Sequence, residues 1–223
     1  MSDPNAYAFS DSDRAAVYRA ILTRRDVRAQ FRPDPVPREV LLRILNAAHH
    51  APSVGFSQPW NFVVIESSEQ RLAVKAMFER ENAKAAENYS GERADLYRSL
   101  KLEGILDSPV NLCVACDRKR AGPHVLGRNT VLDADLFSTC LAVENLWLAA
   151  RSEGLGVGWV SILDPTELGR LLELPDHVVP VAYLCLGYVT QFLPEPELET
   201  HGWRHRLLLE EVIHTNRWSG PPG

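Results

Sequence analysis

The segment Arg24-Arg25-Asp26-Val27-Arg28 places three guanidinium groups within five residues. Guanidinium groups bind phosphate through paired hydrogen bonds, so such a cluster can converge on one phosphate group. The flanking cations favour the carboxylate form of Asp26, which could then accept a proton. The same residues could instead form a solvated charge run with Asp26 in a structural ion pair, and spacing alone does not separate the two interpretations.

A second basic group, Arg204-His205-Arg206, follows Trp203 near the other end of the chain. It could complete an anion site with the first cluster if the fold brings the two ends together. Nearly 180 residues separate the two groups, so the sequence does not show that they meet.

Ser161 follows Gly-Trp-Val at the end of an expected strand. It lacks the Gly-x-Ser-x-Gly context of a nucleophile elbow, which argues against a serine hydrolase. Two interpretations stay open, a hydrogen-bond donor to a polar ligand and an ordinary residue at a strand end.

Two further patterns have simpler explanations than their first appearance suggests. The glycines at 154, 156 and 158 follow a helix and enter a strand, whereas a dinucleotide fingerprint needs strand before helix. Cys113 and Cys116 lie three apart in an expected strand and therefore point to opposite faces, which disfavours thiol exchange. No second cysteine pair supplies a zinc site, so we expect no metal.

Composition limits the partner classes. The chain has 223 residues and a net charge of −5, which offers no general attraction for nucleic acid or anionic lipid. The uncharged apolar stretch Val178–Leu193 is too short for a comfortable membrane span, and the N-terminus has no signal-peptide pattern. With four cysteines in apolar runs, these features predict a cytoplasmic protein with reduced thiols.

Periodicity predicts an α+β fold in a single domain over residues 1–223. Helices precede the first strand, so strict strand-helix alternation is absent. The expected helices cover about 10–23, 38–50, 67–101 with a break at 89–91, 133–152 and 165–173. The expected strands cover 60–65, 110–116, 157–162 and 179–188.

Residues 136–149 are apolar nearly all round, which in a helix indicates burial on most faces. In a chain of this size, a subunit interface could supply part of that burial.

Taken together, these segments resemble the flavin-binding nitroreductase superfamily. The resemblance covers about residues 10–218 and depends on order and spacing in combination. The motifs that carry it are Arg24-Arg25-Asp26-Val27-Arg28, Ala51-Pro52-Ser53-Val54-Gly55-Phe56, Gln58-Pro59-Trp60-Asn61-Phe62, Ser99-Leu100-Lys101-Leu102-Glu103-Gly104 and Gly156-Val157-Gly158-Trp159-Val160-Ser161, with the late basic pair.

The resemblance implies an FMN-binding fold with a central mixed or antiparallel sheet surrounded by helices, in an intertwined homodimer. FMN would lie at the subunit interface, with the partner supplying part of each site. A lid insert is implied at about residues 78–100 and a C-terminal arm at about 190–223. The implied FMN-binding residues are Arg24, Arg25, Asp26, Val27, Arg28, Pro52, Ser53, Lys101, Gly158, Trp159, Val160, Ser161, Arg204 and Arg206.

In detail the motifs are similar to a branch of the family in which reduced FMN is the substrate. There, reduced FMN and dioxygen give 5,6-dimethylbenzimidazole, the lower ligand of cobalamin, with erythrose 4-phosphate as the sugar fragment. The branch requires an aspartate and a serine, which match Asp26 and Ser161. We hypothesise that Asp26 moves protons at the ribityl hydroxyls and that Ser161 orients dioxygen. A closed lid would exclude nicotinamides, so a separate flavin reductase using NAD(P)H would supply reduced FMN.

Two alternatives stay open. One is a conventional FMN-dependent NAD(P)H reductase of the same fold, acting on a nitro compound, a quinone or cob(II)yrinic acid a,c-diamide. The other is a non-catalytic flavin carrier, in which the ion pairs of Asp26 would be structural.

Overall fold

A computed structural model describes residues 7–218 and residue 220. The strands are β1 (Trp60–Ile65), β2 (Val110–Asp117), β3 (Leu155–Val160) and β4 (Val178–Tyr188). The α-helices are α1 (Asp11–Thr23), α2 (Arg38–His49), α3 (Ser68–Ala86), α4 (Gly91–Ser99), α5 (Ala134–Ser152), α6 (Pro165–Leu171) and α7 (Glu197–Thr200). Two short 3-10 helices are η1 (Val54–Phe56) and η2 (Leu209–Val212). The predicted α+β class is confirmed.

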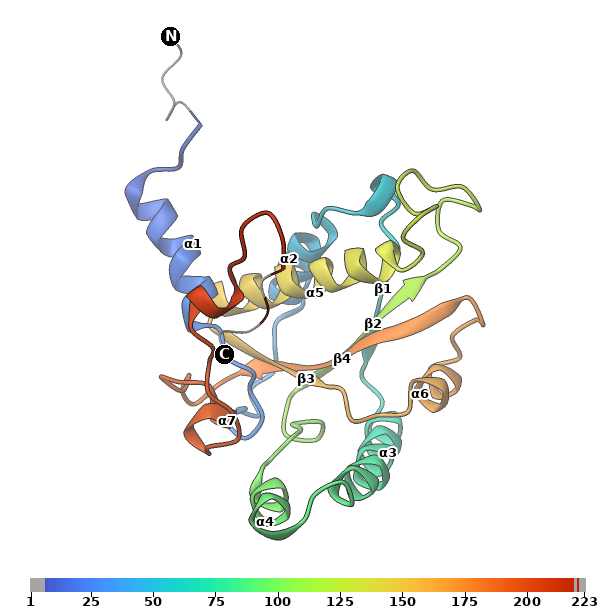
Figure 1. Ribbon diagram of the computed structural model, residues 1–223. Helices are drawn as coiled ribbons and strands as arrows, with labels where there is room; N and C mark the ends of the chain where they lie inside the picture. Colours follow the sequence, from blue (N-terminus) through green and yellow to red (C-terminus); the bar gives the residue numbers. More distant parts are fainter. Residues whose placement is uncertain (1–6, 219, 221–223) are drawn as a thin grey trace.

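The four strands form one antiparallel sheet in the order β1-β2-β4-β3, so β1 and β3 are its edges (Figure 1). Trp60 pairs with Cys116 between β1 and β2, and Leu155 pairs with Tyr188 between β3 and β4. A single parallel bridge joins Asp26 to Val157, and this bridge places the segment after α1 against the outer edge of β3. The sheet is thus antiparallel with one parallel bridge at an edge.

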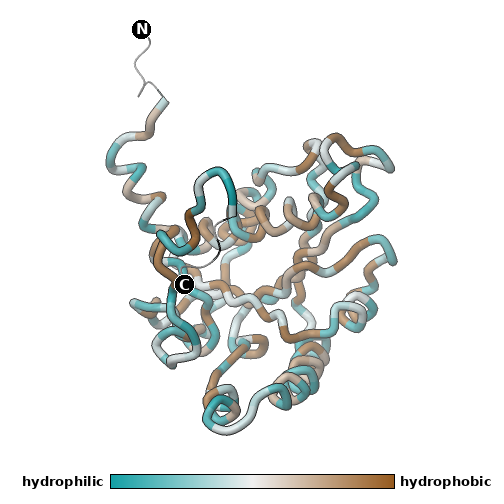
Figure 2. The backbone as a smooth tube through the Cα atoms, viewed as in Figure 1, coloured by the Kyte–Doolittle hydropathy of each residue, from teal (hydrophilic) through white to brown (hydrophobic). Residues whose placement is uncertain are grey.

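Two hydrophobic cores lie on the two faces of this sheet. Helices α2 and α5 pack on one face, and Ile44 and Leu146 are fully buried there. Helices α3 and α6 pack on the other face, where Val74 and Leu168 are buried. Figure 2 shows the hydrophobic segments gathered along the strands and α5, between more hydrophilic outer segments. The sheet is therefore the rigid middle layer that carries the segments described below.

Local sequence signals set most of the element boundaries. Ser10 caps α1 by accepting a hydrogen bond from the Asp13 amide, and Asp164 caps α6 by accepting one from the Glu167 amide. Gly154 follows α5 at φ +80°, a conformation that ends a helix and favours glycine. The expected strand at 157–162 instead runs over Leu155–Val160, because the chain enters the sheet directly after this turn and leaves it before Ser161.

The apolar helix α5 is buried on one side only within a single chain. Phe137 is 59% exposed and Leu141 is 46% exposed, so the expectation of burial on most faces is wrong for the isolated chain. Helix α1 contains no buried residue, and its large apolar side chains, such as Tyr18 and Leu22, are exposed. These two helices leave a hydrophobic surface that the chain itself does not cover.

None of the described helices combines the length and apolar character needed to cross a bilayer.

Candidate functional site

The arginine-rich segment lies along the outer edge of β3. The Val27 amide donates a hydrogen bond of 3.0 Å to the Val157 carbonyl, which fixes the segment in the direction of the strand. The two glycines of β3 make this approach possible. A Cβ atom at Gly158 would lie 2.1 Å from the Val27 carbonyl oxygen, and one at Gly156 would lie 2.7 Å from a Val27 methyl group. The glycine spacing that resembles a nucleotide motif therefore serves close backbone packing.

Asp26 joins β3 to the arginine cluster through both of its carboxylate oxygens. Its Oδ1 accepts a hydrogen bond of 3.0 Å from the Trp159 amide. Its Oδ2 accepts one of 2.7 Å from the buried Arg28 guanidinium. The Asp26 side chain keeps one third of its surface exposed, so the carboxylate remains open to a ligand.

The structure brings the two basic segments together. Arg206, from the C-terminal arm, lies with the arginine cluster around one cavity of about 170 Å³. A wider adjoining cavity of about 680 Å³ is also lined by Arg24, Arg25 and Arg206. The smaller cavity is lined by Arg24, Arg25, Asp26, Arg28, Pro196, Glu197, Leu198 and Arg206.

Hydrogen bonds to the arm hold this arrangement. The Arg25 guanidinium donates to the Pro194 carbonyl, and the Glu199 carboxylate accepts a hydrogen bond of 3.0 Å from the Arg206 amide. The arm turns back at Gly202, whose φ of +71° favours glycine. Arg206 is therefore placed by the fold of the arm.

The cavity has unused capacity to bind an anion. The Nε atoms of Arg24 and Arg25 are buried and have no hydrogen-bond partner among the described residues. The Arg24 Nε atom lies 3.8 Å from a Glu144 carboxylate oxygen, in an ion pair. Buried N–H groups are nearly always hydrogen-bonded in folded proteins, so the Arg25 Nε atom indicates a missing acceptor. Four guanidinium groups and the two carboxylates of Asp26 and Glu197 surround the space, which leaves it positive. Phosphate is an acceptor that guanidinium groups bind well.

Glu197 was not anticipated as a site residue. Its Oε2 atom is buried without a hydrogen-bond partner in the described part of the chain, and it lines the same cavity. The neighbouring prolines 194 and 196 signal only a turn, and no local pattern indicates that this turn reaches residues 24–28.

Ser161 lies on the same edge of the sheet but lines a different cavity, of about 290 Å³, together with Trp159, Val160 and Tyr183. Ser161 is four positions after Val157, and an extended chain spans roughly 13 Å over that length. Burial raises the pKa of Tyr183, and its hydroxyl donates a hydrogen bond of 2.7 Å to Asn111. Tyr183 is thus a protonated core residue, and exposed Ser161 is the hydroxyl available to a ligand.

Pro52 and Ser53 line neither basic cavity. They lie beside the N-terminal part of α5, whereas the arginine segment lies beside its C-terminal part. The amide after Ser53 bonds to Ser138, whereas the arginine segment contacts α5 through Trp147, whose indole donates to the Arg25 carbonyl. Ser138 and Trp147 are nine positions apart on α5, a distance of about 14 Å along the helix axis. Within one chain, the predicted ring-facing loop is not beside the predicted phosphate site.

Lys101 and Arg204 are also outside the basic cavities. Lys101 is paired with Asp107 at 2.5 Å, just after α4. Arg204 is exposed, two residues before Arg206 on the arm.

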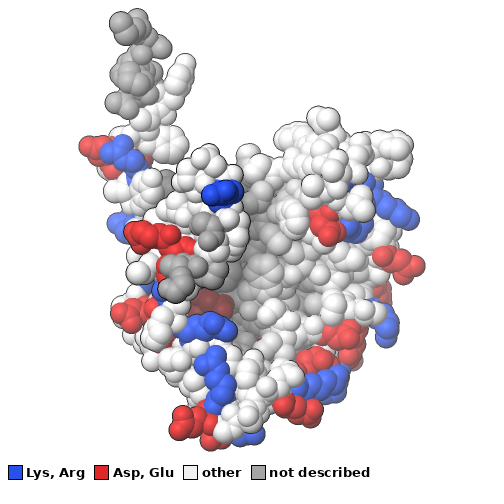
Figure 3. Space-filling view, in the orientation of Figure 1, with Lys and Arg blue, Asp and Glu red and all other residues white. Residues whose placement is uncertain are grey.

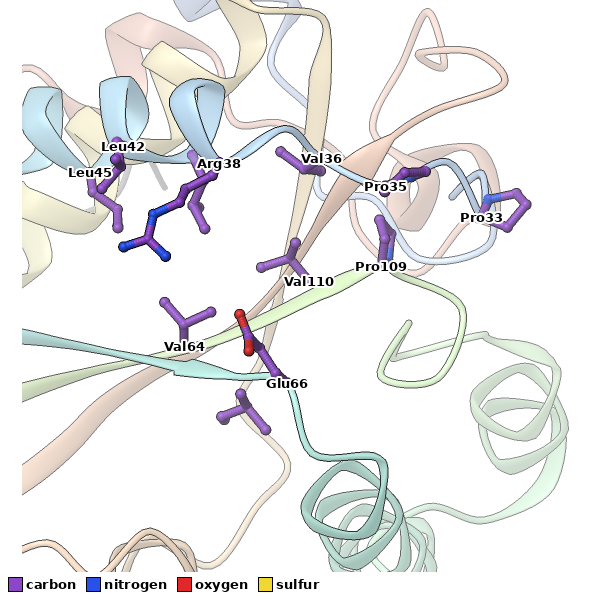
Figure 4. A pocket seen from close by; sticks show the side chains of 12 residues that line it. Pro33, Pro35, Val36, Arg38, Leu42, Leu45, Val64, Glu66, Pro109 and Val110 are labelled. Carbon is purple, nitrogen blue, oxygen red and sulfur yellow. The ribbon is translucent and has the colours of Figure 1, made fainter.

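A hydrophobic groove of about 610 Å³ lies elsewhere, between α2 and the edge of β1 (Figure 4). Arg38 and Glu66 lie on opposite walls of this groove, and Val64 and Val110 also line it. It contains none of the residues predicted for the site. The wider basic cavity, at about 680 Å³, is comparable to this groove in volume, so charge and a buried unpaired donor identify the candidate site.

The space-filling view shows a hollow between the C-terminal arm and α6, over the middle of the sheet (Figure 3). The floor of this hollow is largely uncharged, and Lys, Arg, Asp and Glu side chains lie around its rim. An uncharged floor with charged side chains at its rim suits a ligand that has an apolar ring and a charged tail.

Comparisons with known proteins identify the family and the fold of this chain. The model of the nitroreductase family matches residues 21–188. The 5,6-dimethylbenzimidazole synthase of Rhodospirillum rubrum is 43% identical over 198 residues, which cover 89% of this chain and 93% of that protein. A Rhodobacter capsulatus protein of the same name is 41% identical, over 91% of this chain and 97% of its own length. An iodotyrosine deiodinase structure with bound FMN and 3-iodo-L-tyrosine has a TM-score of 0.70 at 23% identity, over 91% of this chain and all of that one.

Proposed function

This chain belongs to the nitroreductase family, and we propose that it is a 5,6-dimethylbenzimidazole synthase that consumes reduced FMN and dioxygen. The products are 5,6-dimethylbenzimidazole and erythrose 4-phosphate, and the pyrimidine part of the flavin ring leaves as a separate oxidised fragment that takes up the two oxygen atoms of dioxygen. The single observation that carries this proposal is the position of Asp26, which lies at the basic cavity and is hydrogen-bonded to the edge strand that leads to Ser161. The identity of more than 40% with two synthases supports it.

The basic cavity fits the phosphate of FMN. Arg25 offers a buried Nε donor, and Arg24 and Arg206 offer two further guanidinium groups that line the cavity. A phosphate bound there would accept charge-assisted hydrogen bonds, which are about twice as strong as neutral ones. The ribityl chain would then pass Asp26 toward Ser161, with the ring over the uncharged hollow.

Asp26 would act on the ribityl hydroxyls as a proton acceptor. Each of its oxygens already accepts one hydrogen bond, from Trp159 and from Arg28, and this fixes the carboxylate plane while leaving lone pairs for a hydroxyl. A positioned base of this kind contributes about 100-fold to 10,000-fold to a rate. Ser161 would orient dioxygen or the reacting edge of the ring. Reduced FMN itself supplies the ring that becomes the product and the electrons that reduce dioxygen.

The active form that we propose is a homodimer. The uncovered surfaces of α1 and α5 are hydrophobic, and a helix of 13 residues without buried contacts is marginal in water. A second copy packed on these surfaces could bring its own Pro52 and Ser53 to the basic cavity, which would explain why the loop in the same chain is remote from it.

We also propose that residues 78–100 act as a lid over the flavin and that a separate flavin reductase using NAD(P)H supplies reduced FMN. A closed lid would leave no room for a nicotinamide and would keep water from reactive species. Lys101 directly follows this segment and would approach the flavin only as the lid closes.

The direct test is aerobic incubation of the purified protein with FMN and a chemical reductant, followed by chromatography and mass spectrometry. We expect oxygen-dependent loss of FMN matched by 5,6-dimethylbenzimidazole, and neither change in an oxygen-free control. Steady NAD(P)H oxidation with FMN intact would instead identify a conventional reductase acting on a nitro compound, a quinone or cob(II)yrinic acid a,c-diamide. FMN that survives repeated reduction and aeration without turnover would identify a flavin carrier.

A further inference from the structure

Helix α4 of the lid contacts the C-terminal arm through one tryptophan. The Arg93 guanidinium lies 3.6 Å from the centre of the Trp203 ring, within the range of a cation–π interaction. The same guanidinium donates a hydrogen bond of 3.0 Å to the Trp203 carbonyl. Arg93 therefore holds both the side chain and the backbone of residue 203.

Two tyrosines of the lid complete this contact. The Tyr89 ring stacks on Tyr97 at 4.9 Å and meets the edge of Trp203 at 5.2 Å. Tyr97 is buried, and its hydroxyl donates a hydrogen bond of 2.7 Å to Asn82 on α3. The contact of Tyr89, Arg93 and Tyr97 with Trp203, called here the lid–arm contact, thus joins both lid helices to the arm.

Only two residues lie between Trp203 and Arg206, and the backbone amides of both donate hydrogen bonds to α7. The Trp203 amide donates a hydrogen bond of 2.8 Å to the Leu198 carbonyl, and the Arg206 amide donates one of 3.0 Å to Glu199. A shift of Trp203 would move this part of the arm and, with it, the Arg206 guanidinium at the basic cavity.

We propose that Arg93 and Trp203 are positioning residues that couple the lid to the phosphate cavity. A phosphate bound by Arg206 would hold the arm in place, and the arm would hold the lid through Trp203. Because coupling between two sites is reciprocal, a closed lid would in turn strengthen phosphate binding. The lid would therefore favour FMN over riboflavin, which lacks the phosphate. This inference rests on the proposed function only in taking FMN as the ligand.

The first test measures binding of oxidised FMN and of riboflavin by flavin fluorescence or calorimetry, without turnover. We expect Arg93→Ala and Trp203→Ala to weaken FMN binding about tenfold, as loss of a partly desolvated cation–π contact and a hydrogen bond implies. Riboflavin binding should change less than about twofold, because riboflavin makes no contact with Arg206. Trp203→Phe keeps an aromatic ring for Arg93 and should restore most of the FMN preference.

Two matched controls lie on the same elements. Arg98→Ala removes an exposed arginine of α4 that pairs with Asp95 within its helix, and Trp218→Ala removes an exposed arm tryptophan whose ring lies tilted against that of His214. Both should keep the wild-type ratio of FMN to riboflavin affinity. An unchanged ratio in the Arg93 and Trp203 variants, or an equal loss of both flavins with a lowered Tm, would overturn the proposal.

The second test is limited proteolysis at the turn of residues 87–90, which joins α3 to α4. In the wild-type protein FMN should slow cleavage there more than riboflavin does, whereas in Trp203→Ala the two flavins should protect equally. Stronger protection by FMN that persists in Trp203→Ala would contradict the coupling. Because neither test needs product formation, the coupling can be refuted in an active synthase or supported in a protein that proves to be a reductase.

Discussion

Asp26 makes two contacts that an amide could not both keep. Asparagine at this position could still accept the Trp159 amide, but its NH₂ group would face the Arg28 guanidinium, which is also a donor. The substitution therefore removes the proton acceptor and disturbs one ion pair while leaving the backbone of the cavity in place.

Asp26→Asn should lower 5,6-dimethylbenzimidazole formation by about 100-fold or more, the range for loss of a general base. FMN affinity should fall less than about tenfold, because Arg24, Arg25 and Arg206 remain. Product yield by chromatography and FMN affinity by fluorescence separate these effects.

Asp34→Asn is the matched control for this variant. Arg32 and Asp34 form an ion pair at 2.9 Å with the same two-residue spacing, but neither residue lines a basic cavity. Wild-type product yield is expected from Asp34→Asn. An equal yield from Asp26→Asn would remove Asp26 from the mechanism.

At the scale of elements, the path of the arginine segment depends on β3 having no side chains at two positions. Gly156 and Gly158 face Val27 at distances that leave no room for a methyl group. The strand edge and the segment therefore form one unit, and the direction of the strand determines where Asp26 points.

Gly158→Ala should push the segment away from β3, because its Cβ would lie 2.1 Å from the Val27 carbonyl oxygen. We expect a loss of about 1–3 kcal/mol in the free energy of unfolding, typical of overpacking, together with weaker FMN binding. Denaturant titration and fluorescence titration measure the two.

Gly169→Ala provides the comparison, because its nearest contact would be 3.9 Å away and it lies within α6. Alanine should be neutral or stabilising by up to about 1 kcal/mol there. If Gly158→Ala were as stable as Gly169→Ala and bound FMN normally, the packing argument for the β3 edge would be wrong.

For the whole molecule, the uncovered hydrophobic surface is the feature that one chain leaves unexplained. On α5, Phe137, Cys140 and Leu141 are exposed at helical spacing on one face, and the α1 residues Tyr18 and Leu22 are exposed as well. Exposed apolar patches mark interaction sites in soluble proteins. A second copy of the chain is the occupant that we propose.

Leu141→Asp should convert the dimer to a monomer at micromolar concentration, because burying an unpaired carboxylate costs several kcal/mol. Light scattering after size-exclusion chromatography reports the mass. Leu72→Asp, at a residue 57% exposed on α3, should leave the dimer intact.

The cysteines give an independent readout of the same change. Burial raises the pKa of Cys113 and of Cys185 to about 12, so these buried thiols stay protonated and unreactive near neutral pH. Cys140 is exposed in one chain and would be covered in the dimer. A thiol reagent should label Cys140 slowly in the wild type and rapidly in Leu141→Asp; rapid labelling of the wild type would argue against this interface.

The sequence by itself determined the helices and strands, and it predicted that the arginine segment binds an anion. The capping residues Ser10 and Asp164, the helical and strand periodicities and the glycine at 154 are local signals, and the helices and strands follow them to within a few residues. The family motifs around Asp26 and Ser161 are contiguous, so they too could be found without a structure.

Only the tertiary structure decided which residues meet. Packing of the whole chain brings Arg206 to the cluster at 24–28, places Trp203 under Arg93, and separates Ser53 from the arginines. The physical reason is that local propensity involves residues a few positions apart, whereas these contacts depend on how two cores and a sheet edge pack together. No spacing along the chain encodes that arrangement, so the lid–arm contact and Glu197 could be found only in three dimensions.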